Sequence, residues 1–306
     1  MAKDKFKKFD FNINQEHVYN PTNPNIDSDF KLVLTLVWEI LVYILLFIPR
    51  LFQILFMFVF GNPIGAKAKI NFLLSVPFRL IQKLFVWIMQ AKFTAYLMFS
   101  LIVLFIFQFI YITPNPDLSS KFMTHPNHFL EGNFYSVFTA IFLHADLIHL
   151  GMNLLALLIF GRIVEKQFGF KMVYVFLGGG IFANIVSNLI WHYLGDSFYS
   201  IGASGAIASL IMFAIMLDPL VFTTIFVIPV PVFIVGWFLI FLDLTGVSSP
   251  SRINHFAHLA GYLLLLVVFF FLNRNYQRRM MLGFVINVSF LVVAFLAIKI
   301  VGIELF

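Results

Sequence analysis

The sequence predicts an all-α polytopic membrane protein, and two observations indicate this class. Of its 306 residues, 61% are hydrophobic and only 11% are charged, whereas soluble domains have about 45–50% apolar and about 25% charged residues. Apolar runs, each close to the length that crosses ~30 Å of hydrocarbon as a helix, alternate with short polar loops. Helices are expected because a backbone that faces lipid must satisfy its own hydrogen bonds. The composition excludes a soluble enzyme, a disordered chain and a nucleic-acid-binding domain.

Six apolar runs predict a helical core within residues 94–275. The first runs from Ala95 to Thr113 and ends at the turn signal Pro114-Asn115-Pro116. After a long mixed loop, the other five lie at about 143–161, 172–192, 203–217, 220–242 and 255–272. A last run at about 282–304 predicts one additional C-terminal transmembrane helix, which makes residues 276–306 a region of their own.

Residues 1–93 predict a cytoplasmic or interfacial, membrane-associated region. The run 32–60 is apolar but contains Glu39 and Arg50, and both of its flanks are basic. A single crossing would leave one basic flank outside, so interfacial helices or a re-entrant hairpin are favoured over one crossing. Residues 70–90 combine basic and apolar side chains, which is typical of an amphipathic helix in the interface.

The charges of the loops predict the orientation. Basic residues accumulate before the first core helix and in alternate loops, and positive loops remain on the cytoplasmic side. We therefore expect an integral multi-pass protein of the cell (plasma) membrane, with the loop 114–142 on the non-cytoplasmic side. The chain has no cysteine, which excludes disulfides, zinc–thiolate sites and a thiol nucleophile. The basic residues are Lys67, Lys69, Arg79, Lys83, Lys92, Arg162, Lys166, Lys171, Arg274, Arg278 and Arg279.

Three polar motifs lie near the outer ends of core helices. In the first, His149 and Asn153 are four residues apart and share one helix face. The second is Gly202-Ala203-Ser204-Gly205-Ala206, and the third runs from Asn254 to Gly261 and contains His258. Each has an ordinary alternative explanation: helix capping for the first, close packing of small residues for the second, and interfacial polarity for the third.

Helix lengths place Ser204, His149 and His258 at one depth. Each lies ~20 Å from the cytoplasmic end of its helix, and hence ~10 Å below the outer surface of a ~30 Å core. A serine hydroxyl becomes a nucleophile when a neutral imidazole accepts its proton. The oxyanion that then forms needs donors, which the Asn153 amide, His149 and the backbone N–H of Ser204 can supply. A His-Glu-x-x-His zinc motif is absent, so we expect no metal.

These motifs together resemble the rhomboid family of intramembrane serine proteases. The matching residues are His149-x-x-x-Asn153 with His144 five residues before it, Gly202-Ala203-Ser204-Gly205, and Ala257-His258-Leu259-Ala260-Gly261. They fall on the second, fourth and sixth core helices, in the family's order. The resemblance implies a rhomboid-like six-helix transmembrane bundle, to which this chain adds the C-terminal helix and the N-terminal interfacial or re-entrant helices.

The resemblance also implies residue roles. Ser204 would be the nucleophile and His258 the general base and then acid of a two-residue dyad that works through an acyl-enzyme. Asn153, His149 and Ser204 would form the oxyanion hole. The substrates would be transmembrane proteins cleaved in or near their membrane segments within the lipid bilayer, with no cofactor, metal or nucleic acid. The remaining motif residues would be structural: His144, Gly202, Gly205 and Gly261.

The sequence departs from the family pattern at two core positions. Ala208 stands where a tyrosine commonly packs on the catalytic histidine, and Leu265 stands where a glycine is often present. What orients His258 is therefore open, with Tyr262 and Asn254 as candidates at i+4 and i−4.

Two other functions compete with proteolysis. A catalytically inactive rhomboid-like pseudoprotease would bind membrane-protein clients without cutting them, although such relatives typically lack the serine or the histidine. A transporter would need charges along a path through the bundle, and the core has almost none. The run 220–242 contains Pro229 and Pro231, which predict a kinked helix or, by family analogy, a mobile gate.

Overall fold

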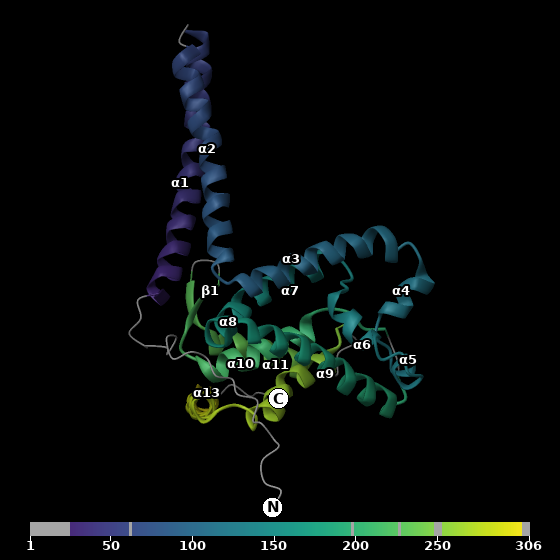
Figure 1. Cartoon of the computed structure of the whole chain (residues 1–306). Helices are drawn as coiled ribbons and strands as arrows, with labels where there is room; N and C mark the ends of the chain where they lie inside the picture. Colours follow the sequence, from purple (N-terminus) through teal and green to yellow (C-terminus); the bar gives the residue numbers. More distant parts are fainter. Residues whose placement is uncertain (1–24, 61–62, 197–198, 226–227, 248–252, 302–306) are drawn as a thin grey trace, which may run out of the picture. The chain divides into compact units, whose positions relative to one another are not determined.

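The computed structural model describes residues 25–60, 63–196, 199–225, 228–247 and 253–301, and these residues are almost entirely helical (Figure 1). Five stretches are long and apolar enough to cross a membrane, and three helices of 10–17 residues are similarly apolar. The prediction of an all-α polytopic membrane protein is confirmed. The five stretches are Leu34–Met57, Ile64–Met89, Lys92–Ile112, Leu147–Tyr193 and Arg274–Leu296, and the shorter helices are Ser204–Leu217, Val232–Gly246 and His255–Phe269.

The chain divides into two compact units. One contains Phe93–Val221 and the chain from Pro231 onward, and the other contains Asn20–Lys92 together with Phe222–Val230. The C-terminal helix therefore belongs to the same compact unit as the core. The division into regions 1–93, 94–275 and 276–306 stays a prediction, and residues 1–24 of the first region lie outside the described residues.

The second unit is built on a hairpin of two long helices, α1 (Asn25–Val59) and α2 (Pro63–Met89). Their pairing is antiparallel, because Lys69 donates to Gln53 at 2.5 Å while Lys83 pairs with Glu39 at 2.5 Å. Either helix is long enough to cross a bilayer. The interfacial or re-entrant placement of this region stays a prediction. A small buried cluster joins the two helices through Ile54, Ala66 and Leu73.

The predicted helix at 220–242 is wrong over its first half. Strands β1 (Phe222–Ile225) and β2 (Ile228–Pro231) form a two-stranded sheet there, and α11 covers Val232–Gly246. The reason is that two prolines so close together, Pro229 and Pro231, each lack a backbone N–H and strongly disfavour a continuous helix. The helix also continues past the predicted end, so Asp243 lies inside α11 rather than in a loop.

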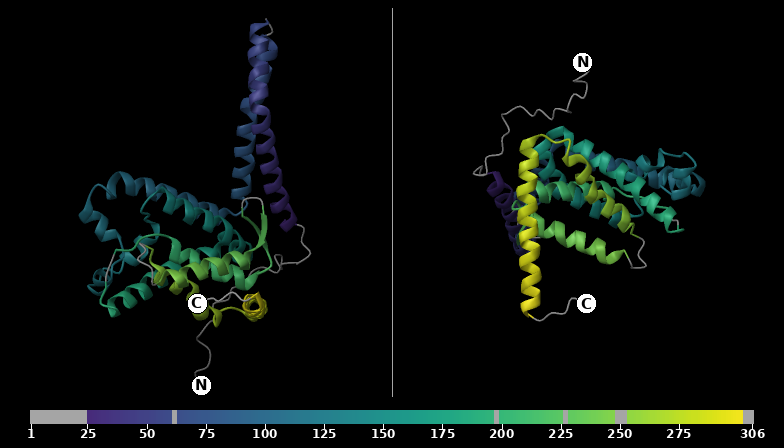
Figure 2. Two further views of the ribbon diagram at one scale, coloured as in Figure 1. Left: turned by 180° about the vertical axis from the view of Figure 1, so that it is seen from behind. Right: turned by 90° about the horizontal axis from the view of Figure 1, so that it is seen from below.

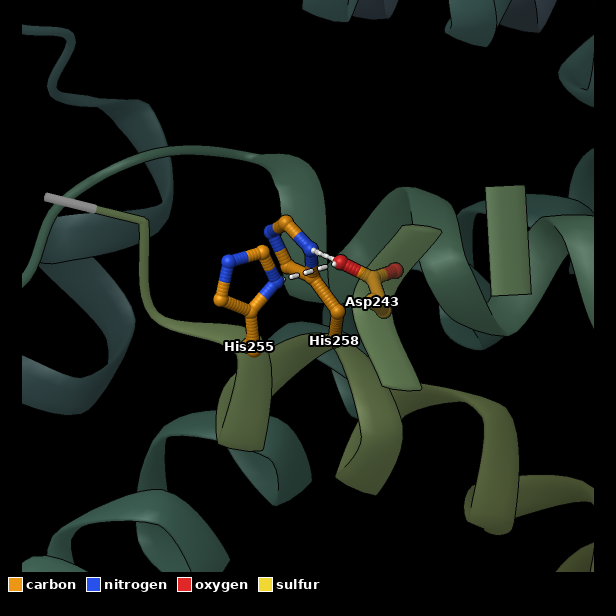
Figure 3. Close-up of side chains that lie close together, drawn as sticks. All are labelled: Asp243, His255 and His258. Carbon is orange, nitrogen blue, oxygen red and sulfur yellow. Dashed lines mark hydrogen bonds and ion pairs between the residues drawn. The ribbon is translucent and has the colours of Figure 1, made fainter. Parts of the chain in front are cut away.

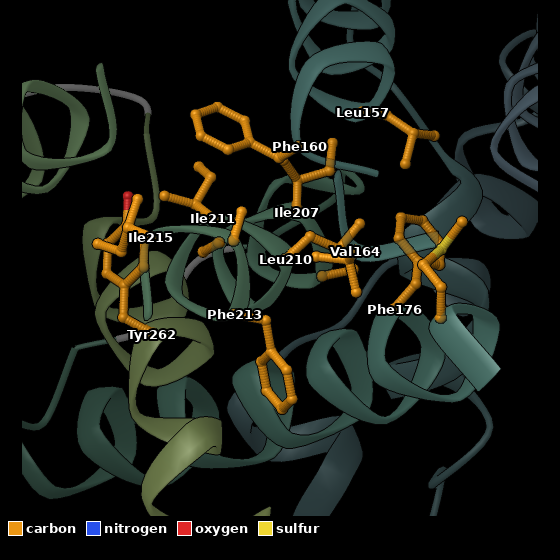
Figure 4. Close-up of a cluster of buried hydrophobic side chains, with 14 of the residues drawn as sticks. Leu157, Phe160, Val164, Phe176, Ile207, Leu210, Ile211, Phe213, Ile215 and Tyr262 are labelled. Carbon is orange, nitrogen blue, oxygen red and sulfur yellow. The ribbon is translucent and has the colours of Figure 1, made fainter. Parts of the chain in front are cut away.

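The first unit consists of helices packed around α10, as Figures 1 and 2 show. Nearly all of α10 is buried, and its apolar side chains form the core with residues such as Phe160 and Phe176 (Figure 4). The elements are α3 (Lys92–Phe107), η2 (Gln108–Ile112), α4 (Pro116–Phe122), α5 (Pro126–Leu130), α6 (Ser136–Thr139), η3 (Ala140–Phe142), α7 (Leu147–Ala156), η4 (Leu157–Gly161), α8 (Arg162–Phe168), η5 (Gly169–Lys171), α9 (Met172–Tyr193), α10 (Ser204–Leu217), α11, α12 (His255–Phe269) and α13 (Arg274–Val301).

The C-terminal helix α13 crosses α10 near the end of α10 (Figure 2, right). A side chain on Gly283 would meet the carbonyl oxygen of Met216 at 2.0 Å, so the backbones touch there. Four residues later, the amide of Asn287 donates to the carbonyl of Ile215 at 2.8 Å. A full turn of α13 thus advances only one residue along α10, which is the register of a steep crossing rather than of parallel packing.

A hydrogen-bonded cluster at the same end of α10 joins this helix to α8 and α13. It consists of Asp218, Arg279 and Gln167, and we call it the inner cluster. Arg279 donates to Asp218 at 2.6 Å and to the Gln167 carbonyl oxygen Oε1 at 2.7 Å, and Gln167 also donates to Asp218. Burial raises the pKa of Asp218, and the charge of Arg279 opposes that shift. The ends of two predicted cytoplasmic loops therefore meet at one end of the bundle, as the predicted orientation requires.

Candidate active site

The three motifs meet at the end of the bundle opposite the inner cluster. Ser204 is the first residue of α10, His258 lies in the first turn of α12, and His149 lies in the first turn of α7. Side-chain caps fix two of these helix starts: Asp146 accepts from the backbone N–H of His149 at 2.8 Å, and Asn254 accepts from that of Ala257 at 3.2 Å.

Ser204 and His258 form a direct hydrogen bond, with 2.7 Å between Ser204 Oγ and His258 Nε2. Close approach of α10 and α12 makes this possible. A side chain on Gly261 would lie 2.2 Å from the Gly205 carbonyl oxygen, so no larger residue fits there at this helix spacing. Ser209 adds a cross-link by donating to the Gly261 carbonyl at 2.9 Å. The two motif glycines therefore set the distance between the hydroxyl and the imidazole.

A carboxylate that the sequence analysis missed completes the cluster. Asp243 Oδ1 lies 2.7 Å from His258 Nδ1 and 2.9 Å from His255 Nδ1, as the dashed lines in Figure 3 mark. Tyr262 donates to Asp243 Oδ2 at 2.8 Å. We call Ser204, His258, Asp243, His255 and Tyr262 the outer cluster. The available signal was a lone acid next to an apolar run. The predicted helix ended at residue 242, so Asp243 was left in the following loop and was not considered as a site residue.

The two candidates for orienting His258 have different positions. Tyr262 reaches His258 through Asp243, whereas the Asn254 side chain bonds to Ser187 Oγ and Ser200 Oγ at 2.8 and 3.1 Å and caps α12. The position of the absent family tyrosine, Ala208, packs instead on the glycine of the third motif. The alanine methyl group cannot bond to His258, and Asp243 on α11 makes the contact with His258 instead.

Of the predicted oxyanion residues, His149 lies next to Ser204 around Gly202. Gly202 has φ +126°, and a side chain there would meet His149 Nε2 at 2.8 Å and Ser204 Oγ at 3.7 Å. The His149 ring and the serine hydroxyl thus flank the bare Cα of Gly202. Asn153 donates to the carbonyl of His149 at 2.9 Å. An amide nitrogen carries two hydrogens, so one remains for a second acceptor.

His144 packs against His149. Its ring is fully buried, 5.1 Å from the ring of His149 between centroids, and its two ring nitrogens have no hydrogen-bond partner within the described residues. Its backbone is held by Gln108, which donates to the His144 carbonyl at 2.8 Å and accepts from its N–H at 2.9 Å. His144 therefore packs beside His149 rather than reaching Ser204.

Comparison with known proteins finds one matching domain. Residues 131–275 match the family model for the rhomboid domain. The predicted resemblance is confirmed at this level.

Several relatives come from Arabidopsis thaliana. RHOMBOID-like protein 12, mitochondrial, is 29% identical over 47% of this chain and 48% of its own length. Rhomboid-like protein 11, chloroplastic, is 33% identical over 46% of this chain and 53% of its own length. RHOMBOID-like protein 6, mitochondrial, is 35% identical over 42% of this chain and 40% of its own length. The chain spans about half the length of the relatives it matches.

Proposed function

We propose that this protein is an intramembrane serine endopeptidase. The observation that carries the proposal is the 2.7 Å contact between Ser204 Oγ and His258 Nε2. That contact pairs a nucleophile with a base at hydrogen-bond distance. Both side chains are partly buried, so a bound peptide bond would react in surroundings where nearby donors act strongly.

The proposed reaction has two halves. His258 Nε2 takes the Ser204 hydroxyl proton while Oγ bonds to the carbonyl carbon, and the former carbonyl oxygen becomes an oxyanion near His149, Asn153 and the Ser204 N–H. The carbon–nitrogen bond then breaks, and His258 gives its proton to the departing amine. Water, deprotonated by His258, attacks the resulting ester in the same manner. The carboxyl product leaves, and Ser204 regains its proton.

The proposed substrates are membrane proteins cut in or near a transmembrane segment. The site lies at the end of the bundle opposite the basic loops, so we propose that it opens to the non-cytoplasmic side. The expected plasma-membrane location has no support from the relatives, because the names given above refer to mitochondria and chloroplasts. The proposed chemistry uses no metal or cofactor.

The test is cleavage of a fluorogenic transmembrane substrate by the protein reconstituted in liposomes. Ser204→Ala and His258→Ala are expected to lower the rate to background, because each removes one half of the proton transfer. Ser209→Ala is the matched control: it removes a serine hydroxyl from the same helix that bonds to Gly261, away from the reacting pair. It should retain most of the activity.

A covalent probe separates activity from client binding. A fluorophosphonate is expected to label the wild type and Ser209→Ala but not Ser204→Ala. Cleavage that persists in Ser204→Ala would exclude the proposed nucleophile. A wild type that folds and binds clients but neither cleaves nor labels would be the inactive, client-binding alternative.

A further inference from the structure

Asp243 occupies an unusual position for an acid. It lies in α11, whose other residues are almost all apolar, and its side chain is only 10% exposed. Burying an isolated carboxylate is costly, and such groups persist in membrane domains where partners satisfy them and where they have a function.

Three donors from α12 satisfy this carboxylate. His255 and His258, three residues apart, direct their Nδ1 atoms at the same oxygen, and Tyr262 bonds to the other oxygen. The three donors lie on successive turns of one face of α12, so this face surrounds the Asp243 carboxylate with donors. Neutral donors leave the carboxylate charge intact, whereas an arginine or lysine partner would neutralise it.

The contact with His258 fixes which ring nitrogen holds the proton. A carboxylate can only accept, so His258 Nδ1 must donate to it and carry a hydrogen. The other nitrogen, Nε2, then has a free lone pair, and it points at Ser204 Oγ from 2.7 Å. The ring is held at both nitrogens in the tautomer that can accept the serine proton.

We propose that Asp243 is a positioning residue that turns the Ser204–His258 pair into a Ser204–His258–Asp243 triad, with Tyr262 and His255 holding the carboxylate in place. The inference rests on the proposed function and deepens it. Asp243 stays ionised throughout the reaction. It holds the Nδ1–H tautomer of His258 and stabilises the imidazolium that forms when His258 accepts the serine proton. This role takes the place of a tyrosine contact that Ala208 cannot make.

The kinetic test uses Asp243→Asn, which keeps the size of the side chain and removes its charge. We expect kcat to fall by about 1,000-fold or more with KM nearly unchanged, because the amide can select the wrong tautomer of His258. Fluorophosphonate labelling of Ser204 should slow in parallel. Tyr262→Phe, which removes one bond to the carboxylate, should lower kcat by about 10-fold. A melting temperature near that of the wild type would show that the variants fold.

A spectroscopic signature tests the same contact without turnover. The His258 Nδ1–H bonded to a carboxylate should give a proton NMR signal downfield of the amide region. His255 Nδ1 bonds to the same oxygen and should give a second such signal, so the His258 signal is the one that His258→Ala removes while the His255 signal remains. The His258 signal should be present in the wild type and in Ser204→Ala, and absent in Asp243→Asn. It identifies the contact even if the protein proves to be inactive.

Three results would overturn the inference. One is a kcat of Asp243→Asn within about 3-fold of the wild type while Ser204→Ala is inactive, which would leave a two-residue protease. Another is a downfield signal that survives Asp243→Asn. The third is a stoichiometric transition metal in the purified protein that is lost in Asp243→Asn, because two histidines and a carboxylate within 4.8 Å can also bind a cation. In contrast, a wild type that neither cleaves nor labels, yet shows the signal, would refute only the proposed function.

Discussion

Two polar clusters lie at opposite ends of α10, and each is centred on a buried aspartate with different partners. In the inner cluster, Asp218 pairs with the fixed positive charge of Arg279. In the outer cluster, Asp243 bonds to two imidazoles and a phenol. An arginine stays protonated, so the inner cluster can only hold helices together. Imidazoles exchange protons near neutral pH, so the outer cluster can take part in a reaction. Similar geometry therefore predicts a stabilising clamp at one end and chemistry at the other.

The largest effect is expected from a substitution that forces apart the helix contact beneath the outer cluster. Gly261→Ala places a methyl group 2.2 Å from the Gly205 carbonyl oxygen, so α12 must move away from α10. We expect a loss of about 3 kcal/mol in unfolding free energy and nearly complete loss of cleavage. Melting in detergent and the cleavage assay measure the two effects. Gly178→Ala, on α9 with open space around it, is the control and should be close to the wild type.

The next effect should appear chiefly in the chemistry. Gly202→Ala directs a methyl group at the His149 ring, 2.8 Å from Nε2, and disfavours the φ of +126°. If His149 borders the oxyanion, kcat of the folded protein is expected to fall by about 100-fold, in addition to the loss of stability that the strained φ causes. Gly195→Ala also changes a glycine with positive φ, +72°, but one with no neighbour within 4 Å. Equal loss in both variants would mean that backbone strain, not the position of His149, is responsible.

The smallest effect should appear at the inner cluster, and in stability rather than in turnover. Arg279→Met leaves Asp218, whose side chain is 8% exposed, without its charged partner. The unfolding free energy should fall by about 1–3 kcal/mol, while kcat of the folded protein stays unchanged. Adding Asp218→Asn should restore part of the stability. A large drop in kcat at an unaltered melting temperature would contradict the division between the two clusters.

The pH dependence of this variant has a definite sign. Burial already raises the pKa of Asp218, and removing Arg279 removes the larger of the two charge effects that oppose the shift, the other being that of Lys166. A raised pKa in the folded state means that the folded protein favours the protonated acid. The loss of stability should therefore be greatest at a pH well above the folded-state pKa of Asp218. It should shrink as the pH falls toward about 4, where the carboxyl of the unfolded chain also binds its proton. Melting curves across this range measure it.

Much of the architecture could be predicted from local chemistry. The excess of apolar residues required a membrane protein, and helix length arithmetic placed Ser204, His149 and His258 at one depth. The structure brings these three motifs to one end of the bundle. Pro229 and Pro231 predicted a kinked helix, which is wrong, because their number and spacing did not reveal a strand pair.

The sequence by itself determined the class of protein, the helical periodicity and the motifs, because these depend on residue type and on spacing along one chain. Tertiary structure decided which side chains meet. Asp243 and His258 are fifteen residues apart on different helices, and nothing in either helix requires them to touch. Their contact follows from how α11 and α12 pack against each other and against α10. Packing of that kind sums contacts over many residues distant in sequence, and so it is settled only in the folded protein.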